Sequence, residues 1–281
     1  MRINTNIMAL NAQNMLTRNQ GGVESSIKKL SSGLRINGAA DDASGLAISE
    51  KMRSQIRGLN QAESNAQDGI SMIQTAEGAL QQTTDILQRM RELVIKGQNE
   101  GVLTGDDKSA ITTELNALRD EIDRIAESTT FNTKTLLNGG LEELSEAALF
   151  KIGANDFEDD LLTVTIGDMR ADKILQTAGG NTVSIDTTDD AKKALSRLDY
   201  AINTVSSERA KLGAMQNRME YAIENLSTTS ENLSAAESRI RDVDMAEEMV
   251  SYTKNSILNQ SAMAMLAQAN QQPQQILSLL G

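Results

Sequence analysis

Residues 212–243 read LGAMQNRMEYAIENLSTTSENLSAAESRIRDV, and the spacing of their apolar side chains decides the fold. One series recurs every seven positions, at Leu212, Met219, Leu226, Leu233 and Ile240. A second, mostly apolar series follows three residues later, at Met215, Ala222, Thr229, Ala236 and Val243. A heptad repeat of this kind forms one stripe along a helix and is typical of coiled-coil packing. We therefore expect a long helix whose stripe packs against other helices.

Three other segments carry helical stripes. One follows strict sevens, at Leu59, Ala66, Ile73, Leu80, Leu87 and Val94. Another has Leu16, Val23 and Leu30 near the start of the chain, and a third has Ile111, Leu115, Leu118, Ile122 and Ile125. For the two middle stripes, 59–94 and 111–125, we expect packing within a bundle. The chain has only three Tyr, three Phe and no Trp, so Leu, Ile, Met and Ala must fill its core.

Two breaks and a change of pattern separate these helices. Residues 31–45 and 97–106 each hold three Gly, and both predict irregular connections, with Thr104 or Asp106 as a helix cap. Short β-type runs at 149–152, 161–166 and 182–185 predict one or two hairpins. Asp189 and Asp190 then open the last long helix. The predicted fold is mainly α, a long antiparallel helical bundle or coiled coil with a small β-hairpin element.

The composition excludes several functions. The sequence has no His and no Cys, so Ser–His and Cys–His catalysis and a two-His zinc helix are impossible. Its net charge of −12 argues against nucleic acid, which needs basic patches. Two acidic clusters, 156–160 and 242–247, do not fit the calcium-loop pattern, and turn chemistry and helix-start charges explain them better. We expect no enzyme activity, no metal and no cofactor.

Both ends of the chain lack charge. Residues 3–17 and 255–281 contain no Asp, Glu, Lys or Arg, whereas an exposed helix normally carries charges on its outer face. Asn, Gln and Ser make up 12 of the 27 residues in the second stretch, so we expect no membrane insertion. Isolated helices are marginal in water. We therefore predict that both ends are disordered in the lone subunit and fold when subunits associate.

Long runs at both ends resemble bacterial flagellins. At the start these are Met1–Asn6 (MRINTN), 9–12 (ALNA), 29–37 (KLSSGLRIN) and 40–48 (ADDASGLAI). At the end they are 239–244 (RIRDVD), 266–274 (LAQANQQPQ) and 277–280 (LSLL), and 150–155 (FKIGAN) is similar to the family's β-hairpin entry. The match covers roughly 1–155 and 190–281. Runs this long at both ends are far more specific than a six-residue signature.

The resemblance implies a two-layer filament subunit for swimming motility. Residues 1–46 and 240–281 would form an inner helical layer with paired terminal helices, and 47–239 an outer bundle with a small β region at about 139–190. The spoke joining them, 34–46, contains Leu34, Arg35, Ile36, Asn37, Asp41 and Asp42. The expected polymerisation core is Ile3, Ile7, Leu10, Leu16, Val23, Ile27, Leu30, Leu258, Met265, Leu266, Ile276 and Leu280.

The resemblance also implies partners and a location. The chain would bind copies of itself, an export chaperone, the filament cap and the hook–filament junction proteins. It would leave the cell through the flagellar type III apparatus without a cleavable signal peptide and reside in the extracellular filament. Arg89, Leu93 and Glu114 match a segment that an animal Toll-like receptor recognises in many flagellins. The alternatives are a hook–filament junction protein and a soluble coiled-coil adaptor, the latter needing charged terminal helices.

Overall fold

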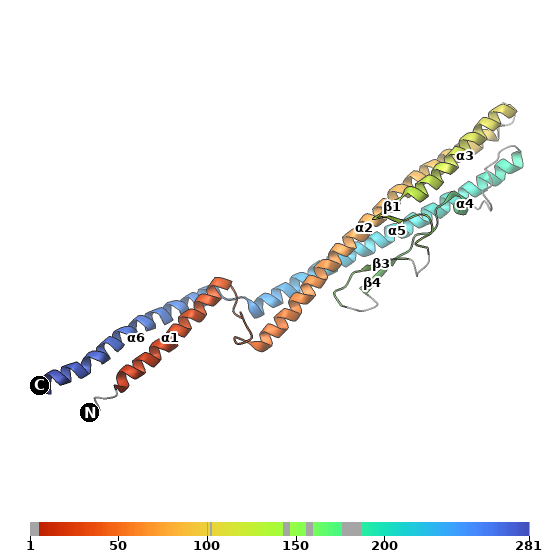
Figure 1. Ribbon diagram of the computed structural model, residues 1–281. Helices are drawn as coiled ribbons and strands as arrows, with labels where there is room; N and C mark the ends of the chain where they lie inside the picture. The colour runs from red at the N-terminus through yellow and green to blue at the C-terminus, as the bar shows by residue number, and fades with distance from the viewer. Residues whose placement is uncertain are drawn as a thin grey trace. The chain divides into compact units, whose positions relative to one another are not determined.

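The computed structural model describes residues 6–99, 101, 103–142, 147–155, 160–175 and 187–280, apart from the side chains of Thr188 and 273–280. Its helices are α1 (Ile7–Ser32), α2 (Ala43–Gly97), α3 (Gly105–Ser128), α4 (Ala171–Ile174), α5 (Thr188–Arg241) and α6 (Met245–Leu280) (Figure 1). Its strands are β1 (Thr130–Phe131), β2 (Lys134–Thr135), β3 (Ala148–Lys151) and β4 (Leu161–Val164). The mainly helical fold class is confirmed.

The chain forms two compact units. The terminal unit comprises Met1–Ile56 and Glu231–Gly281, and the bundle unit comprises Arg57–Ser230. Helices α2 and α5 each contribute to both units, because the division falls inside them. No helix in the described part of the chain is both long enough and apolar enough to cross a membrane.

The bundle unit has a continuous apolar core between α2, α3 and α5. All six members of the α2 heptad stripe are buried, from Leu59 to Val94. Ile111, Leu115, Ile122 and Ile125 contribute from α3, and Leu212 and Met219 from α5. The predicted packing of the two middle stripes within a bundle is confirmed.

Helices α2 and α5 run antiparallel in the bundle unit. Ser230 donates a hydrogen bond to Asn60 (2.9 Å), Arg209 pairs with Glu77 (3.5 Å), and Arg91 pairs with Asp199 (2.9 Å). Residue numbers therefore increase along α2 while those of the contacting residues decrease along α5. These pairs lie at the rim of the apolar core. Exposed ion pairs contribute little stability, so the pairs indicate the register of the two helices but do little to stabilise it.

Thr104 caps α3, as predicted. Its hydroxyl accepts the backbone N–H of Asp107, and its backbone N–H donates to the Asp107 carboxylate (2.9 Å). This reciprocal capping box satisfies donors that have no partner inside the helix. The Thr104 hydroxyl also donates to Asp107 and, with the backbone N–H, lowers the pKa of that carboxyl.

The connector between α1 and α2 is shorter than the predicted 31–45. α1 continues to Ser32 because Gly33 can adopt the left-handed conformation (φ 72°) that ends a helix. α2 starts at Ala43 because the Asp42 carboxylate accepts the N–H of Gly45 (2.9 Å) and so caps the first turn.

Two antiparallel hairpins interrupt the helices. Strands β3 and β4 confirm the runs at 149–152 and 161–166, whereas the run at 182–185 lies outside the described residues. The hairpin β1–β2 was not predicted. Its two-residue turn, Asn132-Thr133, has φ values of 47° and 68°, so it uses positive φ without the glycine that marks most such turns. The single turn α4 was also not predicted.

Strand β3 and the residues that follow it pack against glycines of α2. A Cβ atom on Gly58 would lie 3.0 Å from Cβ and 3.3 Å from Cα of Ala154. One on Gly69 would lie 2.7 Å from the end of the Met219 side chain of α5 and 3.3 Å from the Phe150 ring. Between them, Asn65 donates a hydrogen bond from its side chain to the Lys151 carbonyl (3.1 Å). Glycine inside a helix is unfavourable, so the close approach of the hairpin explains its use here.

Two substitutions in α2 test this explanation. Gly78 has no atom near the position of an added Cβ, so Gly78→Ala should raise the free energy of unfolding by about 0.5–1 kcal/mol through helix propensity. Gly58→Ala gains the same propensity but must displace Ala154, so we expect it to be less stable than Gly78→Ala. Urea unfolding followed by circular dichroism measures both. Equal stabilisation would show that the hairpin does not restrict position 58.

Candidate assembly surface of the terminal helices

Helices α1 and α6 form an antiparallel pair in the terminal unit (Figure 1). The Asn6 side chain donates to the Ala269 carbonyl (2.7 Å), and Lys29 pairs with Glu248 (3.6 Å). Between these contacts, a Cβ on Gly22 would lie 2.8 Å from the Asn255 side-chain nitrogen. Residue numbers thus increase along α1 while those of the contacting residues decrease along α6. The predicted pairing of the terminal helices is confirmed.

The seam between α1 and α6 buries only small residues among the side chains that the structure describes. These are Ser26 in α1 (3% exposed) and Ala262 and Ala269 in α6 (9% and 7% exposed). Leu16, Val23, Leu30 and Leu266 are half-buried. Among the described side chains, the pair therefore has none of the fully buried large residues that stabilise the bundle unit, where Leu80, Leu87 and Leu115 are 0% exposed.

Most of the large apolar side chains of the pair face outward. Five in α1 and seven in α6 are 42–70% exposed: Ile7, Met8, Leu10, Met15, Ile27, Met245, Met249, Val250, Ile257, Leu258, Met263 and Met265. Soluble monomers rarely expose apolar side chains at this density. The surface points to a binding partner with a matching apolar surface.

Charge is confined to one end of the pair. The antiparallel register places the uncharged start of α1 beside the uncharged second half of α6, while the Lys29–Glu248 pair lies near the connector. Both members of that pair are mostly shielded, with 27% and 14% of their side chains exposed. Away from the connector, where α1 and α6 are uncharged, packing and hydrogen bonds must stabilise the pair without ion pairs.

Side-chain caps define the ends of both helices. Asn6 accepts the N–H of Ala9 (3.1 Å) while its amide reaches Ala269, so one residue both caps α1 and ties it to α6. Asp244 accepts the N–H groups of Ala246 (2.9 Å) and Glu247 (3.2 Å) at the start of α6. The acidic 242–247 cluster therefore serves helix-start chemistry at Asp244, as predicted.

The spoke begins with a backbone bridge to the α5–α6 connection. Arg35 N–H donates to the Arg241 carbonyl (2.6 Å), and Val243 N–H donates to the Gly33 carbonyl (3.1 Å), either side of Leu34 and Asp242. The Arg35 guanidinium also donates to the Ile240 carbonyl (2.5 Å). The first residues after α1 are thereby fixed to the chain just after α5.

A second polar group joins the start of α2 to the end of α5. Arg241 donates to Glu50 (3.0 Å) and Ser49 (3.4 Å), and Ser49 donates to Glu237 (2.9 Å). Ser49 is 0% exposed and Arg241 keeps only 12% of its side chain exposed. Shielded polar groups are costly when unpaired, so these contacts favour this alignment of the start of α2 with the end of α5.

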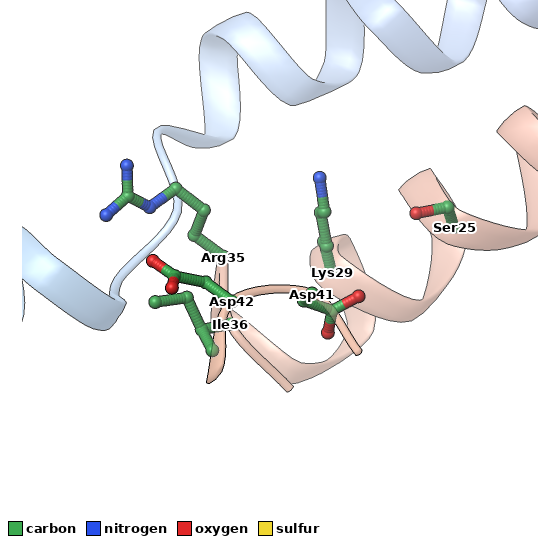
Figure 2. Close-up of a pocket in the computed structure, with 6 residues that line it drawn as sticks. All are labelled: Ser25, Lys29, Arg35, Ile36, Asp41 and Asp42. Atoms are coloured by element: carbon green, nitrogen blue, oxygen red, sulfur yellow. The ribbon is translucent and has the colours of Figure 1, made fainter. Parts of the chain in front are cut away.

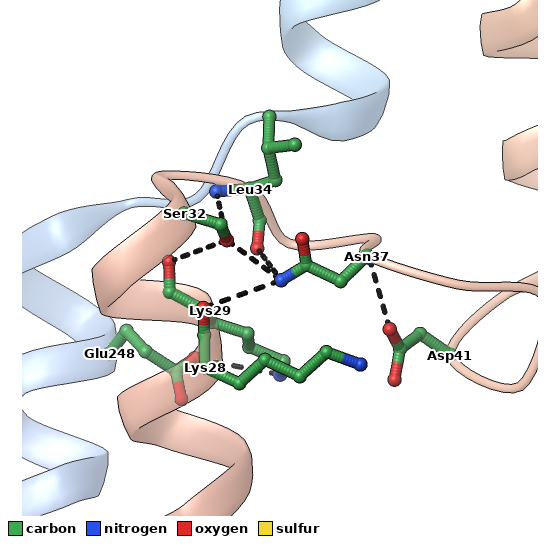
Figure 3. A network of polar contacts seen from close by, with 7 residues as sticks. All are labelled: Lys28, Lys29, Ser32, Leu34, Asn37, Asp41 and Glu248. Carbon is green, nitrogen blue, oxygen red and sulfur yellow. Dashed lines mark hydrogen bonds and ion pairs between the residues drawn. The ribbon is translucent and has the colours of Figure 1, made fainter.

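Asn37 is the centre of the spoke's turn. Its side-chain amide donates to the Ser32 hydroxyl (2.7 Å) and to the carbonyls of Lys28 and Leu34 (both 3.4 Å) (Figure 3). Its backbone N–H and that of Gly38 donate to the Asp41 carboxylate (3.0 and 3.1 Å). The Asn37 N–H is the main reason that the pKa of Asp41 lies below its ordinary value. The turn and the ionised form of Asp41 therefore favour one another.

A polar cavity of about 260 Å³ opens beside this turn (Figure 2). Its lining is Ser25, Lys29, Arg35, Ile36, Asp41 and Asp42. Ile36 is buried (2% exposed) and anchors the loop. The two basic and two acidic side chains balance in charge, so the cavity does not select an ion of either sign.

Models of known families match most of the chain. The N-terminal helical region of bacterial flagellin matches residues 3–141, and the C-terminal helical region matches 195–280. Flagellin of Bacillus subtilis (strain 168) is 52% identical, and flagellin FlaB2 of Treponema pallidum (strain Nichols) 50%, each over 100% of both chains. The chain belongs to the bacterial flagellin family. As a flagellin it is a structural subunit of the flagellar filament and not an enzyme.

Two further comparisons bear on the alternatives. The flagellar filament 33 kDa core protein of Treponema phagedenis is 50% identical over 100% of both chains. A Vibrio parahaemolyticus structure described as a flagellar hook-associated protein has a TM-score of 0.58 and 17% identity, covering 72% of this flagellin and 100% of that chain. At such low identity the likeness extends to the fold alone. The curated relatives are flagellins and a filament core protein, and they support a filament subunit rather than a junction protein or an adaptor.

The expected polymerisation residues divide into three groups in this flagellin. Ile7, Leu10, Ile27, Leu258 and Met265 are exposed, whereas Leu16, Val23, Leu30 and Leu266 are half-buried along the seam. Ile3 and the side chains of Ile276 and Leu280 lie outside the described part. Sequence reasoning did not select Met245, Met249, Val250 and Ile257, which are also exposed. Met8, Met15 and Met263 were likewise not selected, and the helical spacing of these apolar residues was the available signal.

The expected receptor residues have different surroundings. Arg89 donates to Glu114 (3.0 Å) and pairs with Glu92 (3.4 Å), and about half of the Arg89 and Glu114 side chains is exposed (53% and 46%). Leu93 is buried in the bundle core (3% exposed). In this flagellin, therefore, Arg89 and Glu114 present a surface and Leu93 supports it from within.

Asn37→Ala tests the role of the spoke's turn. It removes three side-chain hydrogen bonds that join the turn to α1 and to Leu34, so filaments should dissociate at a lower temperature. Light scattering during heating of assembled filaments measures the change. Ala40→Ser, at an exposed position of the same loop, is the matched control and should leave the dissociation temperature unaltered. If filaments of wild type, Asn37→Ala and Ala40→Ser dissociate at the same temperature, the turn does not contribute to filament stability.

Proposed function

We propose that the α1–α6 pair is the polymerisation core of the filament. The observation that carries the proposal is the set of twelve large apolar side chains left 42–70% exposed on this pair. Burying one such side chain completely is worth about 1.5–3 kcal/mol. A filament offers every subunit the same cover, because neighbouring copies bring identical helices to the common centre.

The absence of charge fits a partner of the same kind. Ile7, Leu10, Leu258 and Met265 lie in the uncharged stretches of the pair, so identical surfaces can meet without like-charge repulsion. The Asn and Gln residues among them can pair with one another or with water. A charged partner would gain nothing from such a surface.

Assembly and folding of the ends are coupled in this proposal. The seam of α1 and α6 buries Ser26, Ala262 and Ala269 but no large apolar residue among the described side chains. Small residues give little hydrophobic stabilisation against the entropy cost of ordering two helices. The ends therefore become stably helical only when they join neighbouring copies. A lone subunit does not carry a preformed polymerisation core.

The proposed layers follow from this core. Residues 1–46 and 240–281 would form the inner layer, with 34–46 as the spoke, and 47–239 would form the outer bundle. Family resemblance supports an export chaperone, the filament cap and the hook–filament junction proteins as further partners, and export through the type III apparatus.

A receptor contact is a second proposal, favoured by the exposed Arg89–Glu114 pair. The two side chains come from adjacent helices and form a small charged surface that an animal Toll-like receptor could engage. The buried Leu93 would act by holding α2 in place beneath it.

Leu10→Lys should abolish seeded filament growth. Leu10 is 52% exposed, so a lysine harms no core in the lone subunit but places an unpaired charge in the proposed interface. Electron microscopy of the concentrated, seeded protein measures filament yield, and circular dichroism should show that the bundle unit stays helical. Leu10→Met, which conserves the apolar volume, is the matched control and should polymerise. Filaments of normal yield from Leu10→Lys would refute the proposed core.

Amide exchange on the same preparations tests the coupling to folding. In the wild-type subunit, 7–30 and 255–275 should exchange fast while the α2 and α5 segments of the bundle unit are protected. In filaments both terminal segments should be protected. Full protection in the lone subunit would contradict ordering on assembly even if the Leu10→Lys result holds.

Arg89→Ala should reduce receptor signalling without unfolding the bundle. The ion pairs of Arg89 are exposed and contribute little to stability. Leu93→Ala, in contrast, should destabilise the bundle by about 2–5 kcal/mol and is a poor probe of binding. A receptor reporter assay on purified subunits, matched in urea-unfolding midpoint, measures the effect. Unchanged signalling by Arg89→Ala would exclude the contact.

A further inference from the structure

The methionines of this chain are sharply divided by exposure. Six are 48–60% exposed, and all six lie in the terminal pair: Met8, Met15, Met245, Met249, Met263 and Met265. Four are 0–5% exposed, and all four lie in the bundle unit: Met72, Met90, Met169 and Met219. Met52 and Met215 are half-buried. The methionines most exposed to solvent therefore coincide with the proposed polymerisation core.

These thioethers are the chain's main targets for mild oxidants. The sequence contains no Cys, no His and no Trp, which leaves methionine as its readily oxidised residue type. Met245 and Met263 are eighteen residues apart, which is five helical turns, and Met249 is one turn from Met245. The three lie along one side of α6. Met8 and Met15, seven residues apart, likewise share one side of α1.

We propose that these six methionines form an oxidation site at which peroxide controls assembly, an inference that rests on the proposed polymerisation core. A sulfur lone pair attacks one oxygen of hydrogen peroxide. An S–O bond forms as the O–O bond breaks, and after a proton shift the products are methionine sulfoxide and water. Sulfur loses two electrons and the peroxide gains them. Methionine sulfoxide reductases reverse the change with electrons from a thiol.

The sulfoxide opposes assembly for a physical reason. It converts an apolar side chain into a polar one whose oxygen needs a hydrogen-bond donor. In the lone subunit that oxygen faces water at no cost. In an interface between helices, the backbone N–H groups of each helix are already paired within it, so the oxygen is buried without a backbone donor. Oxidation therefore selects against the assembled state and leaves the bundle unit intact.

Assembly should in turn protect the sulfurs. Once neighbouring copies cover the terminal pair, peroxide reaches these side chains slowly. The subunit is thus vulnerable between export and incorporation, and the filament is resistant afterwards. The buried methionines of the bundle unit provide an internal reference, because their exposure does not depend on polymerisation.

Peroxide treatment of full-length subunits, followed by seeded growth, tests the inference. Peptide mass spectrometry should find sulfoxide at the six exposed methionines and not at Met90 or Met219, and circular dichroism should be unchanged. Growth on untreated seeds should fall at least about tenfold, the expected effect of burying an unsatisfied polar group. Treatment with two methionine sulfoxide reductases, one for each sulfoxide epimer, and dithiothreitol should restore growth. In preformed filaments the six methionines should oxidise more slowly.

Two variants separate this inference from general damage. Replacing all six exposed residues (Met8→Leu, Met15→Leu, Met245→Leu, Met249→Leu, Met263→Leu and Met265→Leu) conserves volume, and peroxide treatment should not lower the growth of this variant below its own untreated rate. The control, Met90→Leu with Met219→Leu, should stay sensitive. Undiminished growth of wild type carrying the six sulfoxides, or loss that the reductases do not reverse, would overturn the inference. If untreated wild type fails to grow on seeds, the proposed core fails first, and this inference with it.

Discussion

The seam between α1 and α6 closes over Ser26, Ala262 and Ala269, while large apolar residues such as Ile7 and Met265 remain exposed beside it. Two helices can share only one narrow stripe, and here small side chains occupy it. Their other apolar surface must be covered from outside, because water does not favour it. Self-association in a filament meets this need for cover, and the proposed coupling of folding to assembly rests on it.

The bundle unit meets the same physical requirement within a single chain. Three helices surround one core there, so Leu80 of α2 and Leu115 of α3 reach 0% exposure. Leu16 of α1 also belongs to a heptad stripe but is only half-buried, because in the described part of the chain α1 packs mainly against α6. The difference between the units lies in the number of neighbours rather than in the repeat. We therefore expect the bundle to fold before assembly.

Periodicity predicted the helices well because it records burial directly. Every member of the Leu59–Val94 stripe is buried, and Thr104 caps α3 where its spacing placed it. The hairpin at 130–135 escaped prediction because its turn is Asn132-Thr133, and β-branched threonine rarely adopts positive φ. Spoke contacts such as that from Asn37 to the Ser32 hydroxyl depend on how the chain folds back, which a linear pattern does not encode.

The spoke holds its turn largely through contacts within the loop itself. Asp41 accepts two backbone N–H groups of its own turn, Asp42 caps α2, and Ile36 is buried at 2% exposure. These contacts are short in sequence, so they cost little loop entropy. The contacts of Asn37 with Lys28 and Ser32, in contrast, require α1 to be helical up to its end. The turn can therefore form by itself, and its attachment to α1 completes only when the proposed core does.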